Sequence, residues 1–231
     1  MNDRIKRLRR QTFEAQPSLS IERALIETRF YQENYGKYPI PILRALNFLE
    51  ICKRKTIYIG EDELIVGERG PRPKAVPTFP ELTCHSVEDL HILNTRELQR
   101  YTISQEDIDT YEREVIPYWK GRTQRERIFS HVPKEWKEAY EVGMFTEFME
   151  QRAPGHTALD GKVYQYGLLD LKKRIEGELS ALDFMNDPEA TDKPEELTAM
   201  SISSDAALLL AERHADLADE MSLTENDPRR A

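Results

Sequence analysis

The chain has 231 residues and a mass of 27.0 kDa, which is enough for one domain with a sizeable hydrophobic core. Hydrophobic residues make up 39% and charged residues 32% of it, and no run of 18 apolar residues occurs, so a transmembrane helix is excluded. The basic N-terminus lacks the apolar stretch of a secretory signal, and two cysteines cannot form a disulfide scaffold. We therefore expect a globular, cytoplasmic protein.

The formal charge of −9 is concentrated at the C-terminus. Residues 183–231 hold 13 acidic and 4 basic side chains, whereas residues 1–182 are neutral overall. Because phosphate binding needs a net basic face, this distribution argues against nucleic acid as the main partner. The first ten residues are the exception, and a solvated helix face is the simpler interpretation of their basic cluster, Arg4, Lys6, Arg7, Arg9 and Arg10.

The first 54 residues predict three helices. A short basic helix is expected over 3–15, a second over 21–34, and a third after Pro41, which suits a first helical turn. The stretch 42–52 is apolar on nearly all sides, so we expect it to be buried rather than to lie on a surface.

The hydrophobic period changes once, from residue 56 onward. Two runs rich in β-formers flank a glycine-containing turn, which predicts a short β-hairpin over 56–67. The prolines and the glycine of residues 70–80 then predict an extended loop.

The rest of the chain predicts helices again. They are expected over 87–98, 105–114, 124–131, 134–145 and 166–183. Pro117 should break the run after the second of them, and residues 186–196 should form an internal polar loop. Ser203 or Ser204 is expected to cap a last long helix. The predicted fold class is mainly α, with one short hairpin and no closed sheet.

The last residues resemble the start of a helix that is not completed. Asn226 or Asp227 would be its N-cap and Pro228 its first helical residue. This pattern predicts a chain truncated at its C-terminus, and a natural frayed tail is the alternative.

Most motifs for cofactors or catalysis are weak. The five histidines are scattered, without a Cys-x-x-Cys or His-x-x-x-His pair, so we expect no metal site. Cys84 and His85 are adjacent, and neighbouring loop side chains rarely form a nucleophile and its base. Cys52, on an apolar helix, is expected to be a core residue.

One segment, residues 143–157, concentrates reactive side chains. Two glutamates and a glutamine share one helical face, and His156 follows the rigid turn Pro154-Gly155. Such a turn can aim an imidazole at a fixed point, where it donates to a substrate oxygen or acts as a general acid. The alternative is a charged helix end whose histidine binds local carbonyl groups.

The same segment carries a family resemblance, in the string Phe145-Thr-Glu-Phe-Met-Glu-Gln-Arg-Ala-Pro-Gly-His-Thr157. It resembles the N-terminal part of glycyl radical enzymes of the pyruvate formate-lyase superfamily, and most of all their hydroxyproline dehydratases. Other segments match in the same order: Ser20-Ile-Glu-Arg-Ala24, Ile40-Pro-Ile-Leu-Arg-Ala45, Asp62-Glu-Leu-Ile-Val-Gly-Glu68, Ala75-Val-Pro-Thr-Phe-Pro-Glu81, Glu114-Val-Ile-Pro-Tyr-Trp119 and Gly167-Leu-Leu-Asp-Leu-Lys172. The resemblance implies that residues 1–231 are a partial pyruvate formate-lyase domain, the N-terminal helical layer of an α/β barrel enzyme whose barrel is largely absent.

The resemblance also implies a function. The parent would be a radical dehydratase or lyase of anaerobic metabolism, of a kind often labelled formate C-acetyltransferase, acting on a small molecule. In the dehydratases this string lines the substrate pocket, which implies that Phe148 packs on the substrate and His156 binds its hydroxyl or carboxylate end. The thiyl cysteine, the glutamate base and the radical-bearing glycine of the family have no counterpart in this chain. We therefore expect no catalytic residue here and no activity of the chain alone.

Cofactors and partners follow from the same resemblance. We expect no cofactor bound to this chain and no metal. The parent enzyme would need a glycyl radical installed by an S-adenosylmethionine iron–sulfur activating enzyme, and would form a homodimer without nucleic acid or membrane as partner. Isethionate, glycerol and hydroxyproline enzymes share the scaffold, so the substrate stays open. The competing hypothesis is a stand-alone helical interaction or regulatory module derived from this fold. Because the helix at 42–52 would normally pack against the barrel, we also expect an unusually large exposed apolar patch.

Overall fold

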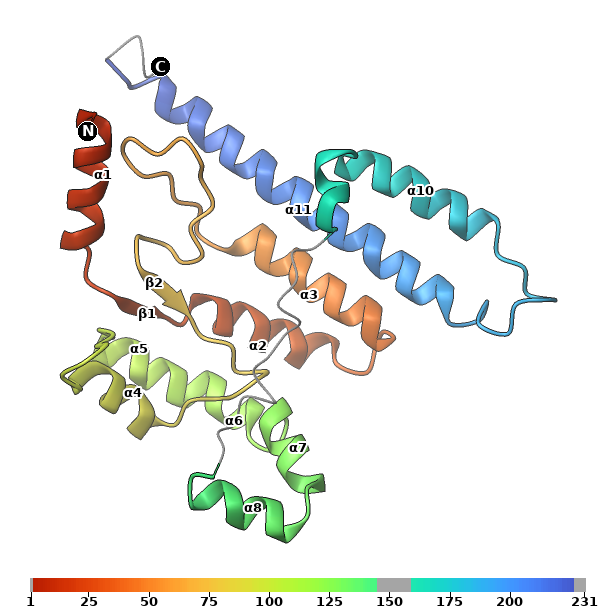
Figure 1. The fold of residues 1–231 in the computed structure, drawn as a ribbon, viewed down its shortest axis with the longest axis horizontal. Coiled ribbons are helices and arrows are strands. Elements are labelled where there is room, and N and C mark those ends of the chain that lie inside the picture. Colours follow the sequence, from red (N-terminus) through yellow and green to blue (C-terminus); the bar gives the residue numbers. More distant parts are fainter. Residues whose placement is uncertain (1, 145–158, 227–231) are drawn as a thin grey trace.

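The structure is a computed structural model that describes residues 2–144 and 159–226 (Figure 1). Helices dominate it, and two short strands pair. The elements are α1 (Asp3–Glu14), β1 (Ser18–Ser20), α2 (Glu22–Asn34), α3 (Ile40–Arg54), β2 (Ala75–Pro77), α4 (Val87–Thr95), α5 (Gln105–Thr110), the π-helical turn η1 (Tyr111–Val115), α6 (Ile116–Trp119), α7 (Gln124–His131), α8 (Lys134–Glu141), the 3-10 turn η2 (Asp160–Tyr164), α10 (Leu168–Ser180) and α11 (Lys193–Ser222). The mainly α fold class is confirmed. None of the described helices is long and apolar enough to cross a membrane.

Side-chain caps explain where several of the helices begin. In α4 the Ser86 hydroxyl accepts a hydrogen bond from the Asp89 amide at 3.1 Å, and the Asp89 carboxylate accepts one from the Ser86 amide at 2.8 Å. Ser104 caps α5 by accepting from the Asp107 amide at 3.1 Å. These contacts satisfy amides that have no partner inside the helix, so the starts of both helices follow from the sequence.

The hairpin predicted over 56–67 is wrong. These residues form turns and extended loop, and the strand pair is instead β1 with β2, in parallel, with Ser18 opposite Ala75 and Ser20 opposite Pro77. A two-stranded hairpin is marginally stable unless one of its faces packs on something. The apolar residues of the expected second strand, 64–66, are exposed, so that packing is missing in this chain.

Pro117 does not break the helical run as predicted. The turn η1 joins α5 to α6, and in it the Ile116 amide donates to the Tyr111 carbonyl, five residues earlier. A proline removes one N–H and clashes with the carbonyl four residues before it in an ordinary α-helix. The wider π turn accommodates both effects and lets the helix continue to Trp119.

The last helix begins earlier than predicted. It starts at Lys193, inside the segment predicted as a loop, and Ser203 and Ser204 lie in its interior rather than at its cap. Both hydroxyls donate to carbonyls one turn earlier, at 2.8 and 2.9 Å. A serine bonded in this way is tolerated inside a helix, and Pro194 occupies the first turn, where its missing N–H costs nothing.

The main core lies in what we call the body, built from β1, β2, α2, η1 and α4–α6. Its buried apolar residues are Leu19, Ile21, Ala24, Leu90, Ile103, Ile108, Tyr111, Val115 and Trp119. The Trp119 indole donates to the Thr28 hydroxyl at 2.8 Å, and Tyr31 and Tyr118 meet its ring edge to face. The strands and α2 are thereby fixed to the segment that ends at α6.

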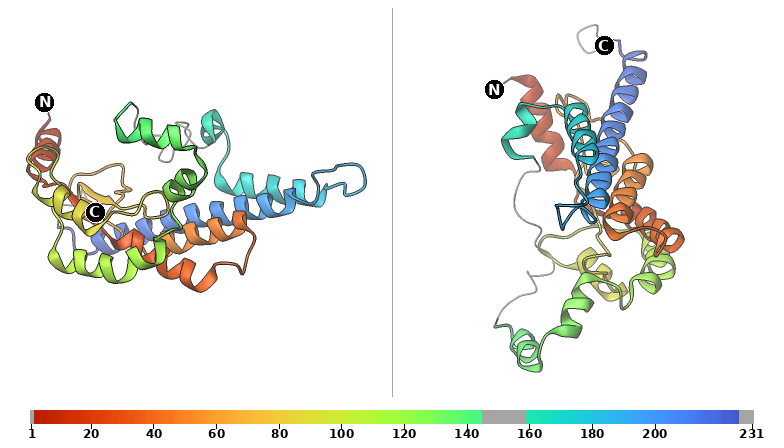
Figure 2. Two further views of the ribbon diagram at one scale, coloured as in Figure 1. Left: turned by 90° about the horizontal axis from the view of Figure 1, so that it is seen from below. Right: turned by 90° about the vertical axis from the view of Figure 1, so that its right-hand side faces the viewer.

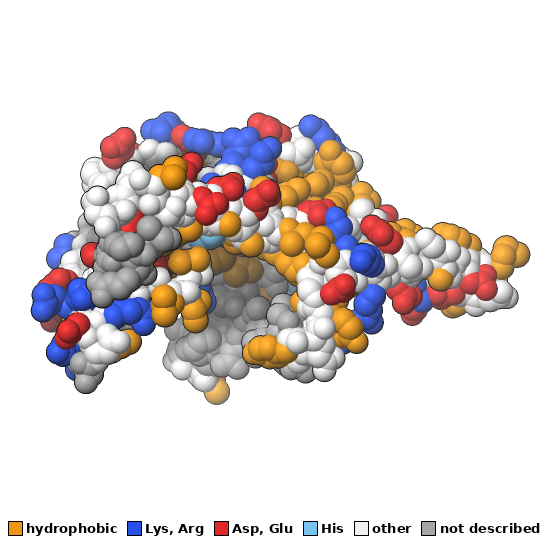
Figure 3. Space-filling model, turned by 90° about the horizontal axis from the view of Figure 1, so that it is seen from above, with side chains coloured by type: hydrophobic (Ala, Val, Ile, Leu, Met, Phe, Trp, Pro, Cys, Tyr) orange, Lys and Arg blue, Asp and Glu red, His pale blue; other side chains and the backbone are white. Residues whose placement is uncertain are grey.

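A second region, the arm, consists of α10, residues 181–192 and α11. The two helices run side by side and the arm extends away from the body (Figures 1 and 2). Along its length α11 packs on α3, where the Arg213 guanidinium donates to the Cys52 carbonyl at 2.6 Å. Burial of the helix at 42–52 is confirmed in part: Leu43, Ala45 and the predicted core residue Cys52 are buried, whereas Phe48 is exposed. Hydrophobic side chains stay on the surface along the arm (Figure 3).

Candidate functional site

The two predicted substrate-binding residues, Phe148 and His156, lie outside the described residues, together with the rest of the string to which they belong. Before this segment α8 ends at Glu141, and after it η2 begins at Asp160. Among the described residues, two of the places where polar side chains meet in a confined space involve α2.

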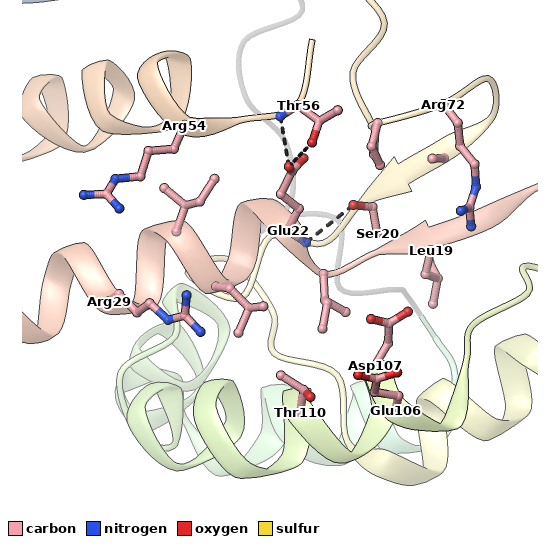
Figure 4. A pocket seen from close by; sticks show the side chains of 15 residues that line it. Leu19, Ser20, Glu22, Arg29, Arg54, Thr56, Arg72, Glu106, Asp107 and Thr110 are labelled. Carbon is pink, nitrogen blue, oxygen red and sulfur yellow. Dashed lines mark hydrogen bonds between the residues drawn. The ribbon is translucent and has the colours of Figure 1, made fainter. Parts of the chain in front are cut away.

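The first place is a hollow of about 530 Å³ at the junction of β1, α2, β2 and α5 (Figure 4). Leucine, isoleucine and alanine side chains form its apolar part, and arginine and acidic side chains surround them. Its lining residues are Leu19, Ser20, Ile21, Glu22, Leu25, Ile26, Arg29, Arg54, Thr56, Pro71, Arg72, Ala75, Glu106, Asp107 and Thr110.

Several charged groups of this hollow are already paired. The Glu22 carboxylate accepts from the Thr56 amide at 2.9 Å and from its hydroxyl at 2.5 Å (Figure 4). The Arg72 guanidinium donates to the Ser18 hydroxyl, and Arg29 binds Glu114 at 2.7 Å. The lining, all of it within the described ranges, includes no histidine or cysteine. Its chemistry suits the binding of a polar molecule rather than nucleophilic catalysis.

The second place is a buried ion cluster centred on Arg23 of α2. Its guanidinium donates to Glu27 at 2.8 Å and to both carboxylate oxygens of Glu81, at 3.0 and 2.6 Å. It also lies 4.2 Å from the centre of the Phe79 ring. From α3, the Asn47 amide donates to the second oxygen of Glu27 at 2.9 Å. Arg23 and Glu27 together therefore join α2, α3 and the loop after β2.

Glu27 is the unusual member of this cluster. Its side chain is 1% exposed, and this burial, with the charge of Glu81 beside it, raises its pKa to about 9, against the opposing effect of Arg23 and Asn47. When Glu27 is protonated, the cluster holds one carboxylate, that of Glu81, and one guanidinium, so its net charge is zero. A carboxyl group that keeps its proton near neutral pH is typical of general acids. Because this one is buried, we interpret it as part of a structural clasp.

The thiol and imidazole that are adjacent in sequence do not form a reactive pair. The Cys84 sulfur lies 3.8 Å from the Tyr111 hydroxyl and 3.8 Å from the backbone oxygen of His85. Burial raises the pKa of Cys84 to about 11 and lowers the pKa of His85. The thiol is therefore protonated at neutral pH, and its contacts are with a phenol and a carbonyl. No group of three or more His, Cys, Asp or Glu in the described part of the chain could hold a metal ion.

Sequence reasoning missed the Arg23 cluster. Its ion pair with Glu81 spans 58 residues, which no local pattern can indicate. One signal was available: both residues belong to segments that carry the family resemblance, Ser20–Ala24 and Ala75–Glu81.

Comparison with known proteins places this geometry in context. The family model described as pyruvate formate lyase-like matches residues 1–231. The chain is 45% identical over 225 residues to the trans-4-hydroxy-L-proline dehydratase of Clostridioides difficile, covering 97% of this chain and 28% of that protein. It is 32% identical to the isethionate sulfite-lyase of Desulfovibrio desulfuricans, over 95% of this chain and 28% of that protein. The chain thus spans less than a third of the length of these relatives.

Solved structures agree with these matches. The hydroxyproline dehydratase of Clostridioides difficile with trans-4-hydroxy-L-proline bound superimposes with a TM-score of 0.94 at 44% identity, covering 100% of this chain and 29% of that one. The glycerol-bound, B12-independent glycerol dehydratase of Clostridium butyricum superimposes with a TM-score of 0.89 at 29% identity, covering 100% of this chain and 29% of that one. A glycyl radical enzyme from Archaeoglobus fulgidus superimposes with a TM-score of 0.85 at 26% identity, covering 99% of this chain and 29% of that one. The mostly helical chain matches the N-terminal part of such structures.

Proposed function

The chain belongs to the pyruvate formate lyase-like family, and from that premise we propose that it forms the N-terminal portion of a glycyl radical dehydratase whose substrate is trans-4-hydroxy-L-proline or a close analogue. One observation carries the proposal: the superposition on the substrate-bound hydroxyproline dehydratase, with a TM-score of 0.94 over the whole chain. The identity to that enzyme, 45%, exceeds the 32% to an isethionate sulfite-lyase, which favours the hydroxyproline branch.

Within this function, Phe148 and His156 form part of the wall of the substrate pocket. Phe148 packs against the ring of the substrate. His156 binds the hydroxyl group that leaves or the carboxylate that anchors the molecule. A neutral imidazole both donates and accepts hydrogen bonds and titrates near neutral pH, which suits assistance to a departing hydroxyl group. The support is the Pro154-Gly155 dipeptide that precedes the histidine in the sequence and the family string that contains both residues.

The cysteines of this chain do not fit the radical relay of such an enzyme. Cys52 is buried under α11, with its carbonyl bound by Arg213, and Cys84 contacts Tyr111. The glycyl radical, the thiyl cysteine and the base therefore belong to parts of the fold that this chain does not span. The activating enzyme with its iron–sulfur cluster, and the homodimer, are partners of that complete protein. This chain alone should show no turnover.

A chimaera tests the proposal. This chain replaces the matching part of the Clostridioides difficile dehydratase, and the activated chimaera is assayed for turnover of trans-4-hydroxy-L-proline, with its radical content measured by electron paramagnetic resonance. We expect turnover in the parent chimaera. His156→Gln should lower it by about 10²–10⁴ while the radical signal stays normal, because the loss of a general acid has that size.

Three results would contradict the proposal. A chimaera that carries the radical but does not turn over hydroxyproline would rule out the substrate. A His156→Gln variant with unchanged turnover would make the histidine structural. Loss of the radical signal in that variant would also count against a pocket role, because it would assign the residue to folding or activation.

A further inference from the structure

The loop between α3 and β2 presents three consecutive β-forming side chains to solvent. Leu64, Ile65 and Val66 are 79%, 92% and 39% exposed. Single exposed apolar residues are common on protein surfaces, but three in a row are not.

The backbone of this tripeptide is also unpaired. Within the described residues, no hydrogen bond joins an N–H or C=O of residues 64–66 to another group, and these residues lie in neither strand. Their sequence nevertheless has the pattern of a strand, which is why a hairpin was expected there. A conflict between local preference and observed conformation indicates that a partner is missing.

Contacts on both sides hold the tripeptide in place. Before it, Arg7 of α1 binds the Asp62 carboxylate at 2.5 and 2.7 Å, and Arg4 donates to the Asp62 carbonyl at 2.7 Å. After it, the Lys55 ammonium group donates to the Glu68 carbonyl at 2.7 Å. Apolar side chains and free backbone groups are thus presented between two fixed points, which lowers the entropy lost when a partner binds.

We infer that residues 64–66 are a docking strand. An extended apolar segment pairs with them, and this segment belongs to the part of the pyruvate formate lyase-like fold that the chain does not span. This inference rests on the proposed function. It commits to that occupant because the chain covers only 28–29% of its relatives, so most of the fold that its surfaces would meet lies outside it. The recognition is β-augmentation, in which backbone hydrogen bonds supply affinity and alternate side chains fill apolar pockets.

A second copy of the chain fits the tripeptide less well. A stable dimer interface buries roughly 1,200–2,000 Å² in total, with about 20–30 residues on each side. Three residues are far too few for that, unless they are one element of a much larger contact. The complementary part of the fold provides such a contact, and a two-strand pairing between copies does not.

The experiment compares the isolated chain with the chimaera described above. Hydrogen exchange should show the amides of residues 64–66 unprotected in the isolated chain and about 100-fold or more protected in the chimaera. Ile65→Lys should leave the midpoint temperature of the isolated chain unchanged and should lower that of the chimaera or abolish its soluble yield. The matched control is Met185→Lys, at a side chain that is 90% exposed in the arm, and it should be silent in both proteins.

Several outcomes would overturn the inference. Protection of the amides in the isolated chain at low concentration would mean that the strand already has a partner, and protection that grows with concentration would identify that partner as a second copy. If Ile65→Lys does not change the midpoint temperature or the soluble yield of the chimaera, or if the parent chimaera is insoluble, the rest of the fold is not the partner of residues 64–66. A stable chimaera that shows the strand effect but no hydroxyproline turnover would contradict the proposed function alone, and the converse result would contradict only the docking strand.

Discussion

The body and the arm are both built from amphipathic helices, yet different kinds of contact hold them together. In the body, groups far apart in the sequence bond directly: the Trp119 indole with the Thr28 hydroxyl, and the Leu19 amide with the Thr102 carbonyl at 2.9 Å. In the arm, α10 buries only Ile175, and the Lys172–Asp205 ion pair ties it to α11. Helical periodicity alone therefore does not distinguish a closed core from a face that still needs a partner.

The largest difference in stability is expected between a buried apolar side chain of the body and an exposed one of the arm. Trp119→Ala in the body should lower the free energy of unfolding of the isolated chain by roughly 3–5 kcal/mol, through the cavity and the lost contacts. Leu169→Ala on the exposed face of α10 should change it by less than about 0.5 kcal/mol. Urea unfolding followed by circular dichroism measures both. Equal effects would mean that the arm has a core of its own.

Loss of an ion pair should also destabilise the body more than the arm, but the difference should be smaller than for the apolar side chains. Arg23→Ala leaves Glu27 and Glu81 facing each other in a buried place and should cost about 3 kcal/mol, the lower end for a broken buried pair because Arg23 and Glu81 keep some exposure. Lys172→Ala breaks a half-exposed pair in the arm and should cost less than about 1 kcal/mol. The same urea experiment compares them. A silent Arg23→Ala variant would contradict the clasp.

A further effect is a dependence of stability on pH, which is spread over several pH units. The pKa of Glu27 is about 9 in the folded chain against an ordinary value of 4.5, so the folded state keeps a proton that the unfolded state loses. Its contribution to stability is fully present below pH 4.5 and is lost as the pH rises toward 9, by at most about 1.4 kcal/mol per pH unit.

Glu27→Gln isolates this contribution, because the amide resembles the protonated acid. Its N–H can donate to the Asn47 side-chain oxygen, which has no hydrogen-bond partner among the described residues of the parent. The stability of the variant minus that of the parent should therefore rise with pH between 5 and 9, as measured by urea unfolding at each pH. A difference that is flat across this range would show that Glu27 is ionised when folded.

The sequence predicted helices well where the signal is local. The caps at Ser86 and Ser104 and the apolar spacing of α10 involve residues within one or two turns of each other. It failed where the outcome depends on distant groups. The strand pair needs Ser18 beside Ala75, and the expected hairpin lacks a surface to pack on.

The candidate site divides along the same line. Phe148 and His156 stay predictions from a family string, whereas the Arg23 clasp depends on Glu81, which only folding brings near. Pro117 shows a third case. A residue that normally ends a helix continues one here, because η1 changes the hydrogen-bond spacing just before it.

The contact between α11 and α3 has a consequence for the time course of synthesis. The Arg213–Cys52 hydrogen bond joins residues 161 positions apart. At the usual rate of about 5–20 residues per second, roughly 8–32 seconds pass between the synthesis of Cys52 and that of Arg213. During that interval the apolar face of α3 has no α11 to cover it. The nascent chain therefore exposes an apolar, association-prone helix for many seconds, and we expect a chaperone to bind it at the ribosome until α11 emerges.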